Sequence, residues 1–169
     1  MNYSLIILKP DALQKGVVAD VFDMIRESGL TITNVREPAV LDEDLLKQHY
    51  SEHEGKPFYD SLIKTMRSGP AITAIVAGDD ARRRIRELAG ETEPAKSGHN
   101  TIRGRFSDDT YAAAEAEGRS LHNVIHTSGN VEEAKKEMRI WFPELFDKEP
   151  TLSGSPSVPD KATSMRCDI

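Results

Sequence analysis

The sequence predicts an α+β fold in which a four-stranded antiparallel sheet is packed against helices. Short apolar segments rich in β-branched residues alternate with segments whose apolar residues recur at helical spacing. Their order is strand, helix, strand, helices, strand, helix, strand, helix. This order contains the βαββαβ pattern of the ferredoxin-like sandwich, so helices are expected on one face of the sheet. The 169 residues match one ordinary domain, at about 150 residues per domain.

The first half of the chain supplies two of the expected strands. The opening strand, "YSLIIL", ends at "KPDA", where Pro10 and Asp11 favour a turn. The following helix stops at "SGL", and a later helix has Pro57 in its first turn and Gly69 beyond its last. We expect strands at residues 3–8 and 30–41, and helices at residues 17–27, 42–53 and 57–69.

The second half contains the other two strands and a long connection. A short apolar run bounded by glycine predicts a buried strand, and the helix after it begins with acids and ends at a glycine. Residues Gly90–Phe106 have no clear period, so we expect a long loop, which in a compact domain is usually functional or disordered. We expect strands at residues 71–77 and 121–126, and helices at residues 79–90, 110–120 and 130–142, the last capped by Asn130.

The composition changes after Pro150. The segment "TLSGSPSVPDKATSMRCDI" has too little apolar content to fold alone. We therefore expect one domain at residues 1–150 and an extended or disordered tail at residues 151–169. The only cysteine, Cys167, lies in this tail, so neither an intramolecular disulfide nor a cysteine-based metal site can be built.

The charge balance excludes several classes of function. The chain has 22 Lys and Arg against 28 Asp and Glu, a net charge of -6, which argues against bulk electrostatic binding to nucleic acid or to an anionic membrane. The apolar run at the N-terminus is shorter than a secretory signal core, and no stretch is as long as a membrane span. We expect a cytoplasmic protein whose partners include neither nucleic acid nor membrane.

His126 stands where an apolar segment breaks into small polar residues, in "NVIHTSGN". A histidine at a strand end is often a hydrogen-bonded structural residue, and from its position alone that interpretation stays open. Its surroundings favour chemistry, because Ser128 lies two residues on and Glu137 lies in the helix that starts near Asn130. A carboxylate there could reach one ring nitrogen and leave the other free to attack.

Several basic residues lie at loop or helix ends: Lys9 follows the first strand, Arg86 lies near the end of a helix, and Arg103 and Arg105 lie in the long loop. Each on its own would be an ordinary surface charge. Together, near strand ends and a helix N-terminus, they could bind a phosphate chain, with arginine as a forked donor and lysine as a point charge. The sequence has neither a Gly-x-x-x-x-Gly-Lys loop nor a Gly-x-Gly-x-x-Gly element, so a phosphate site would have to be built from side chains.

The segment "NVIHTSG" resembles the active-site signature of nucleoside diphosphate kinases, in which Asn-x-x-His-x-Ser is followed by an acid. Four further segments resemble the same family in the expected order: "LIILKPDAL", "HYSEHEGKPFYDSLIKTMRSGP", "LAGETEPAKSGHNTIRGRF" and "EEAKKEMRIWF". The resemblance covers about residues 2–146, and its several ordered motifs make it specific.

The resemblance implies that His126 accepts the γ-phosphate of a nucleoside triphosphate and passes it to a nucleoside diphosphate in a ping-pong mechanism. Glu137 would orient the ring, and Ser128 would hydrogen-bond nearby. The phosphates and sugar would be held by Lys9, Tyr50, Arg86, Thr92, Arg103 and Asn123. Phe58 and Leu62 would border the base, and since every base has a π-face, broad base specificity is expected. No carboxylate cluster suits a metal alone, so Mg²⁺ would arrive with the nucleotide phosphates.

The sequence departs from the family pattern at two places. Gly129 stands where an acid commonly follows the serine, so a carboxylate role there is missing or supplied from elsewhere, and glycine adds backbone freedom. The segment 107–122 is longer than the common form, and we expect a helix around Tyr111–Gly118 at the rim of the active site or at a subunit contact.

Two other functions are compatible with parts of the sequence. One is a catalytically silent relative that binds nucleotide or protein as a regulator or scaffold, against which the set His126, Glu137, Lys9, Arg86 and Arg103 argues. The other is a nucleic-acid-binding ferredoxin-like module, which should have strand aromatics and a basic sheet face, whereas only 6% of the residues are aromatic. The family resemblance also implies a closed homo-oligomer, a tetramer or a hexamer.

Overall fold

The strands of the central sheet pair antiparallel throughout, in the order β2–β3–β1–β4, in a computed structural model that describes residues 2–147. The strands are β1 (Asn2–Leu8), β2 (Thr31–Val35), β3 (Ile72–Gly78) and β4 (Ile125–Thr127). This order confirms the ferredoxin-like α+β fold that the sequence predicts. The expected tail at 151–169 lies outside the described residues.

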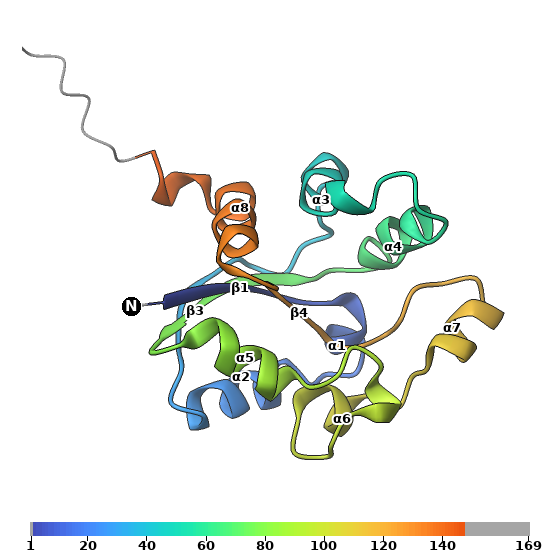
Figure 1. Ribbon diagram of the computed structural model, residues 1–169, viewed down its shortest axis with the longest axis horizontal. Coiled ribbons are helices and arrows are strands. Elements are labelled where there is room, and N and C mark those ends of the chain that lie inside the picture. The colour runs from blue at the N-terminus through green and yellow to red at the C-terminus, as the bar shows by residue number, and fades with distance from the viewer. Residues whose placement is uncertain (1, 148–169) are drawn as a thin grey trace, which may run out of the picture.

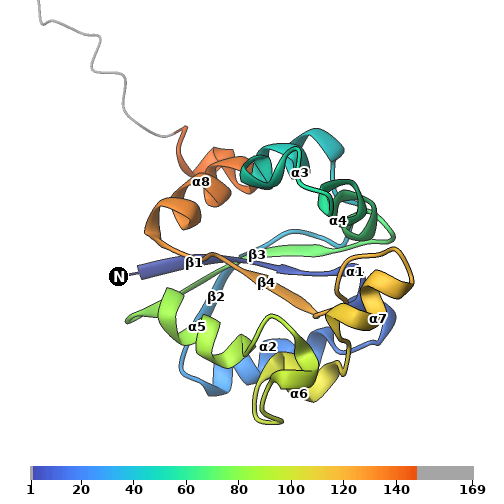
Figure 2. The ribbon, with the colours of Figure 1, turned by 45° about the vertical axis from the view of Figure 1, so that its right-hand side comes forward.

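Apolar residues on both faces of β1 place the sheet between two layers of helices. Ile6 and Leu8 belong to one core cluster, and Leu5 and Ile7 belong to the other. Helices α2 (Val18–Glu27) and α5 (Ala81–Ala89) supply apolar side chains to the first cluster. Helices α3 (Glu43–His49), α4 (Tyr59–Met66) and α8 (Val131–Trp141) cover the other face, as Figures 1 and 2 show.

The expectation of helices on one face only is therefore wrong. The central strands β1 and β3 are buried almost along their whole length, so each face of the sheet needs a cover. The pair α3 and α4 lies between β2 and β3 in the chain and provides part of that second cover, together with α8. None of the helices between residues 2 and 147 is long and apolar enough to cross a membrane.

Several expected boundaries differ from the structure. A five-residue helix, α1 (Pro10–Gln14), replaces the expected turn, and β2 is shorter than residues 30–41, with only a bridge between Ala39 and Ala71 beyond it. The fourth strand begins at Ile125 rather than at residue 121. The expected loop 90–106 contains a 3-10 turn, Pro94–Lys96, and the helix α6 (Ile102–Phe106).

Side chains at helix starts account for much of this local structure. Asp42 begins α3 by accepting from two backbone N–H groups, and Asn130 begins α8 by accepting from the N–H of Glu133. Threonines do the same for two short helices: Thr101 for α6 and Thr110 for α7 (Tyr111–Ala116). The expected helix in the longer segment is thus present. Short 3-10 turns complete the described chain at Ser51–His53 and Pro143–Leu145.

Candidate active site

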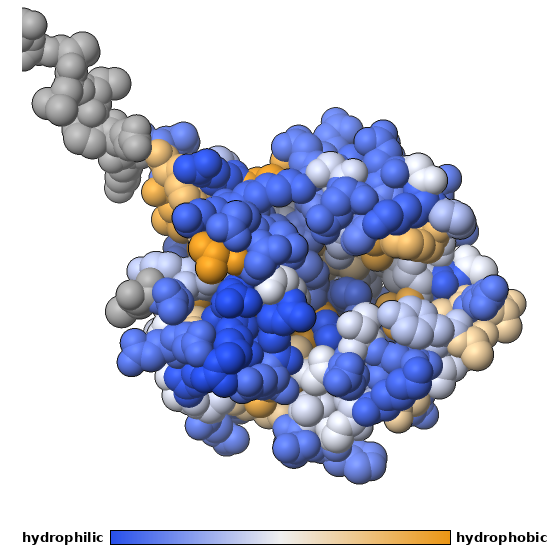
Figure 3. Space-filling model, in the orientation of Figure 1, coloured by the Kyte–Doolittle hydropathy of each residue, from blue (hydrophilic) through white to orange (hydrophobic). Residues whose placement is uncertain are grey.

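A hollow of about 730 Å³ opens between the ends of β1, β4, α3 and α5 and the segment that carries α6. In Figure 3 it lies between the layer of α3 and α4 and the layer of α6. Most of the site residues predicted from the sequence line this hollow, although they come from distant parts of the chain. These residues are Lys9, Tyr50, Leu62, Arg86, Thr92, Arg103, Asn123 and His126.

His126, Glu137 and Ser128 form a connected group beside this hollow. Strand β4 pairs with β1, which places His126 opposite Ile7, and α8 brings Glu137 over the ring. His126 Nε2 lies 3.0 Å from Glu137 Oε1, and the Ser128 hydroxyl donates to Glu137 Oε2 at 2.5 Å. The carboxylate accepts a hydrogen bond from the Nε2–H group. In the neutral ring the other nitrogen, Nδ1, therefore carries no proton and has a free lone pair.

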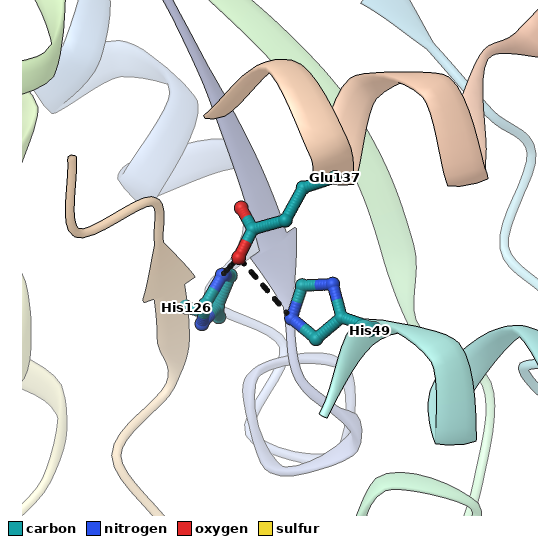
Figure 4. A group of neighbouring side chains, drawn as sticks. All are labelled: His49, His126 and Glu137. Carbon is teal, nitrogen blue, oxygen red and sulfur yellow. Dashed lines mark hydrogen bonds and ion pairs between the residues drawn. The ribbon is translucent and has the colours of Figure 1, made fainter. Parts of the chain in front are cut away.

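His49 is a second imidazole ring beside this group, and the sequence interpretation missed it. Its ring centroid lies 4.6 Å from that of His126, and its Nε2 lies 3.6 Å from Glu137 Oε1 (Figure 4). The three side chains are close enough to hold a metal ion. However, the indole N–H of Trp141 donates to His49 Nδ1 at 3.1 Å, so the Nε2 of a neutral ring carries the proton and His49 is a donor rather than a ligand.

Lys9 and Asn123 form a polar pair at the floor of the hollow. The ammonium of Lys9 donates to Asn123 Oδ1 at 2.5 Å, and the Asn123 amide donates to the carbonyl of Thr92 at 2.9 Å. Burial, together with the nearby Arg103, lowers the pKa of Lys9 to about 8. A buried ammonium with an arginine beside it is suited to an anionic ligand, which would favour its charged form.

The guanidinium of Arg103 donates to two backbone carbonyls, and its Nε has no hydrogen-bond partner among the described residues. Its two terminal nitrogens donate to the carbonyls of Gly90 and Ile125, both at 2.8 Å, and its Nε is buried with no hydrogen-bond partner among the described residues. Burial and the neighbouring Arg86 lower its pKa to about 10. Arg86 lines the same hollow from the end of α5. Arg105, a further candidate from the sequence, does not line it and instead lies over the ring of Phe106.

A strained turn joins Asn123 to β4. Val124 has a φ of 69°, and the N–H of Ile125 donates to the carbonyl of Asn123 at 2.7 Å, which closes a three-residue turn. A β-branched residue is strained in this region of φ. The turn is held on both sides, since the N–H of Val124 donates to Asp11 Oδ2 and its carbonyl accepts from the N–H of Lys9, both at 2.9 Å. Asp11 is thus a second residue whose role the sequence interpretation missed.

The two residues predicted to border a base, Phe58 and Leu62, lie at the start and in the middle of α4. Leu62 lines the hollow, whereas Phe58 does not. Phe58 is 47% exposed at the start of α4, and its ring centroid lies 5.4 Å from that of His53, which does line the hollow. Tyr50 is buried beside His49, and burial, together with Glu137, raises the pKa of its hydroxyl.

The longer segment 107–122 connects two walls of the site. Its backbone donates from Tyr111 to Glu93 Oε1 and from Ser120 to the hydroxyl of Thr65. Glu93 belongs to the segment before α6, and Thr65 belongs to α4. Within the segment, Arg119 and Asp109 form a two-pronged ion pair at 2.6 and 3.0 Å. These contacts join α7 to the two elements that flank the hollow, while no residue of 107–122 lines it, so a position at its rim stays a prediction.

Gly129, where the sequence lacks the expected acid, has a carboxylate beside it. The N–H of Gly129 donates to Glu133 Oε2 at 2.8 Å, and its carbonyl accepts from Arg82 at 3.0 Å. A side-chain carbon built on Gly129 would collide with Glu133 Oε2 and stand 3.2 Å from Arg86 Nη1. Glu133, in the first turn of α8, therefore supplies a carboxylate at this point. The two hydrogen bonds of Gly129 restrain its backbone, although glycine itself would allow more freedom.

The fold and the site together define a class of enzyme. A histidine fixed by a carboxylate, next to a hollow lined by lysine and arginine side chains, is typical of a phosphotransferase that binds phosphate-rich substrates. The family model for nucleoside diphosphate kinase matches residues 2–145. The chain therefore belongs to the nucleoside diphosphate kinase family, and it is an enzyme of that kind.

Individual relatives agree with this assignment. The nucleoside diphosphate kinase of Mycobacterium avium is 40% identical over 142 residues, which cover 83% of this chain and 96% of the relative. That of Clostridium perfringens is 36% identical over 149 residues, covering 88% and 96%.

Solved structures of the family have the same fold. A Borrelia burgdorferi nucleoside-diphosphate kinase with bound vanadate and ADP matches with a TM-score of 0.79 at 34% identity, covering 83% of this chain and 86% of the other. A Halobacterium salinarum nucleoside diphosphate kinase in complex with CDP has a TM-score of 0.73 at 31% identity, covering 83% and 87%.

Proposed function

We propose that this chain transfers the γ-phosphate of a nucleoside triphosphate to a nucleoside diphosphate by a ping-pong mechanism, through a phosphohistidine at His126. One observation carries the proposal: Glu137 Oε1 holds the Nε2 side of His126, which leaves Nδ1 as the nucleophile beside a cationic hollow. The alternative is a silent relative that binds nucleotide without turnover, and the connected His126, Glu137 and Ser128 group speaks against it.

The transfer takes place in two similar halves. In the first, the Nδ1 lone pair of His126 bonds to the γ-phosphorus while the bond from that phosphorus to the bridging oxygen breaks, and the nucleoside diphosphate leaves with that oxygen. In the second, a terminal oxygen of the acceptor diphosphate attacks the phosphorus, and the nitrogen recovers its electron pair. Glu137 stabilises the positive charge that the ring gains, so neither half needs a strong base.

The cations of the hollow neutralise the charge on the moving phosphoryl group. We assign Lys9, Arg86 and Arg103 to the phosphates, with Thr92 as an additional hydroxyl donor. Tyr50 and Asn123 would contact the phosphates or the sugar, and Phe58 and Leu62 would border the base. Mg²⁺ would come with the nucleotide and offset part of the phosphate charge, since the cluster of potential metal ligands among the described residues contains His49, whose Nε2 carries a proton.

The relatives support a broad choice of base. The Borrelia structure contains ADP and the Halobacterium structure contains CDP, one purine and one pyrimidine. An exposed aromatic ring such as that of Phe58 can stack on either. From the family resemblance we further propose a cytoplasmic homo-oligomer, a tetramer or a hexamer, with nucleotides rather than nucleic acid or membrane as partners.

Intact-mass measurement after exposure to ATP and Mg²⁺ tests the proposal. The wild-type chain should gain one phosphoryl group and lose it when a nucleoside diphosphate is added. His126→Gln should gain none while it still binds nucleotide, because it keeps size and some hydrogen bonding but has no nucleophilic ring. Glu137→Gln should react more slowly, since it removes the charge that favours the reactive ring.

A second histidine provides a matched control for this experiment. His99 is exposed and does not line the hollow, so His99→Gln should behave as wild type. A phosphoryl group that persists on His126→Gln would move the nucleophile to another residue. A wild-type chain that binds ATP and gains nothing would establish the silent relative instead.

A further inference from the structure

His49 combines burial with a polar atom that has no hydrogen-bond partner. Its side chain is 1% exposed, and its Nε2 has no partner among the described residues at hydrogen-bond distance. An unsatisfied buried donor costs on the order of 1–3 kcal/mol, so a position that keeps one needs an explanation. The nearest acidic group is Glu137, whose Oε1 lies 3.6 Å from this nitrogen, within ion-pair range but beyond a hydrogen bond.

The protonation state of His49 is fixed by its surroundings. Burial lowers its pKa well below the usual value, and His126, Lys136, Lys9 and His53 lower it further in that order, so the ring is neutral near pH 7. A neutral ring carries one proton. Because the indole of Trp141 donates to Nδ1 at 3.1 Å, that proton must lie on Nε2, which faces Glu137.

Glu137 is consequently surrounded by donors on both of its oxygens. Oε2 accepts from the Ser128 hydroxyl at 2.5 Å, and Oε1 lies 3.0 Å from His126 Nε2 and 3.6 Å from His49 Nε2. A carboxylate on the second turn of a helix can rotate about its own bonds, and these contacts restrict that rotation. Hydrogen bonds of a catalytic group are often long without substrate and shorten when it binds.

We propose that His49 is a positioning residue, whose Nε2–H, oriented by Trp141, holds Glu137 Oε1 on the Nε2 side of His126 and so keeps Nδ1 of His126 free to attack. This rests on the proposed phosphohistidine function. His49 itself does not line the hollow. The chain Trp141–His49–Glu137–His126 runs from α8 through α3 back to α8 and on to β4, so it also ties the helical layer to the strand that carries the nucleophile.

Three substitutions separate this role from simple packing. His49→Gln places an amide N–H near the Nε2 position and should restore the donor to Glu137. His49→Asn places a carbonyl near the Nδ1 position, so it keeps the acceptor for Trp141 but has no group that reaches Glu137. Trp141→Phe removes the indole donor and lets His49 adopt either neutral form.

The rate of His126 phosphorylation by ATP and Mg²⁺, followed by rapid quenching and intact mass, gives the first readout. We expect His49→Asn to react roughly tenfold more slowly, as for one lost hydrogen bond, and His49→Gln to stay within about threefold of wild type. Trp141→Phe should fall between them. Thermal melting confirms that each variant is folded. An Asn variant as fast as wild type, or a Gln variant as slow as the Asn variant, contradicts the proposal.

Nitrogen-15 NMR of the histidine rings, recorded without nucleotide, gives the second readout. In the wild type both His49 and His126 should carry their proton on Nε2, and in Trp141→Phe and His49→Asn the preference of the affected ring should weaken. A wild-type His49 that is protonated on Nδ1 would overturn the proposal even if every variant failed to fold. This readout is independent of turnover: a wild-type chain that is never phosphorylated refutes the phosphohistidine function, whereas the spectra still decide whether His49 positions Glu137.

Discussion

Lys9 carries its charge into surroundings that make the charge costly. Its side chain is only 8% exposed in the folded chain, and burial and Arg103 lower its pKa from 10.5 to about 8. Each pKa unit corresponds to about 1.4 kcal/mol, so keeping Lys9 protonated in these surroundings costs roughly 3 kcal/mol of folding free energy at neutral pH. A phosphate group that binds beside Lys9 would stabilise the ammonium and offset this unfavourable free energy. A phosphate-binding site can therefore keep a lysine that destabilises the protein without ligand.

We therefore predict that Lys9→Met stabilises the nucleotide-free protein while weakening nucleotide binding. The loss of the hydrogen bond to Asn123 offsets about 1 kcal/mol, so the free energy of unfolding should rise by about 1–2 kcal/mol at pH 7. Below pH 8 both the folded and the unfolded chain hold the proton, and the full cost is present. As pH rises from about 8 to 10.5 the folded wild type loses the proton first, so its stability rises and the difference should narrow.

Denaturant unfolding at pH 7 and pH 10, with nucleotide titrations on the same samples, measures both effects. Lys15, whose ammonium is exposed and donates to the carbonyl of Phe106, is a matched control, and Lys15→Met should show no such change with pH. A Lys9→Met variant that is less stable than wild type at pH 7 would contradict the account.

The residues that line the site could be predicted from sequence motifs, as could Glu137 and Ser128 beside His126, but two other supporting residues could not. Lys9, Arg103 and His126 stand in recognisable segments, and the structure brings them to one hollow. His49 and Asp11 have roles only in three dimensions. Asp11 accepts from the N–H of Val124, which is 113 residues away, and His49 depends on Trp141, which is 92 residues away.

At the scale of elements, periodicity predicts the long helices and fails for the short ones. Helices α2, α5 and α8 have 9 to 11 residues, enough for a repeated apolar face. Helices α1 and α6 have five residues each, which is little more than one turn and gives no period. Strand β4 is short because the strained turn at Val124 delays its start, and that turn depends on Asp11 from the other end of the chain.

The short helix α6 positions one residue of the site, Arg103. Arg103 is followed by Gly104, whose α-carbon faces the backbone of Ser97 and Gly98 so closely that any added side-chain carbon would collide with their carbonyl groups. The N–H of Gly104 donates to the hydroxyl of Thr101, and this hydrogen bond holds Gly104 against the same backbone. This explains why glycine follows arginine at this point, in a segment that must fold back on itself.

We predict that Gly104→Ala destabilises the protein by about 1–3 kcal/mol, since overpacking against backbone cannot be relieved by a rotamer change. The displacement of α6 should also loosen Arg103 and raise the KM for nucleotide. Thermal unfolding and steady-state kinetics measure the two effects. Gly69→Ala is a matched control, since its added carbon would meet only ordinary contacts at 3.5 Å or more and should change little. Equal effects of the two substitutions would rule out this packing explanation.

At the scale of the whole molecule, two core clusters on opposite faces of one sheet account for the folded domain. The residues of both clusters lie between Leu5 and Phe142. The family match ends at residue 145. The segment from Thr151 onward lies beyond this match, and its apolar content is low.

We predict that deletion of residues 151–169 leaves a folded and active enzyme, because this segment has little apolar content and lies beyond the family match, which ends at residue 145. Thermal unfolding of the two chains should agree within a few degrees, since a segment with so few apolar side chains can add little to the unfolding free energy. Light scattering should give the same oligomeric state for both chains. If the shortened chain loses its oligomeric state but stays folded, the segment acts between subunits. If it cannot fold at all, the segment belongs to the core and the domain boundary at residue 150 is wrong.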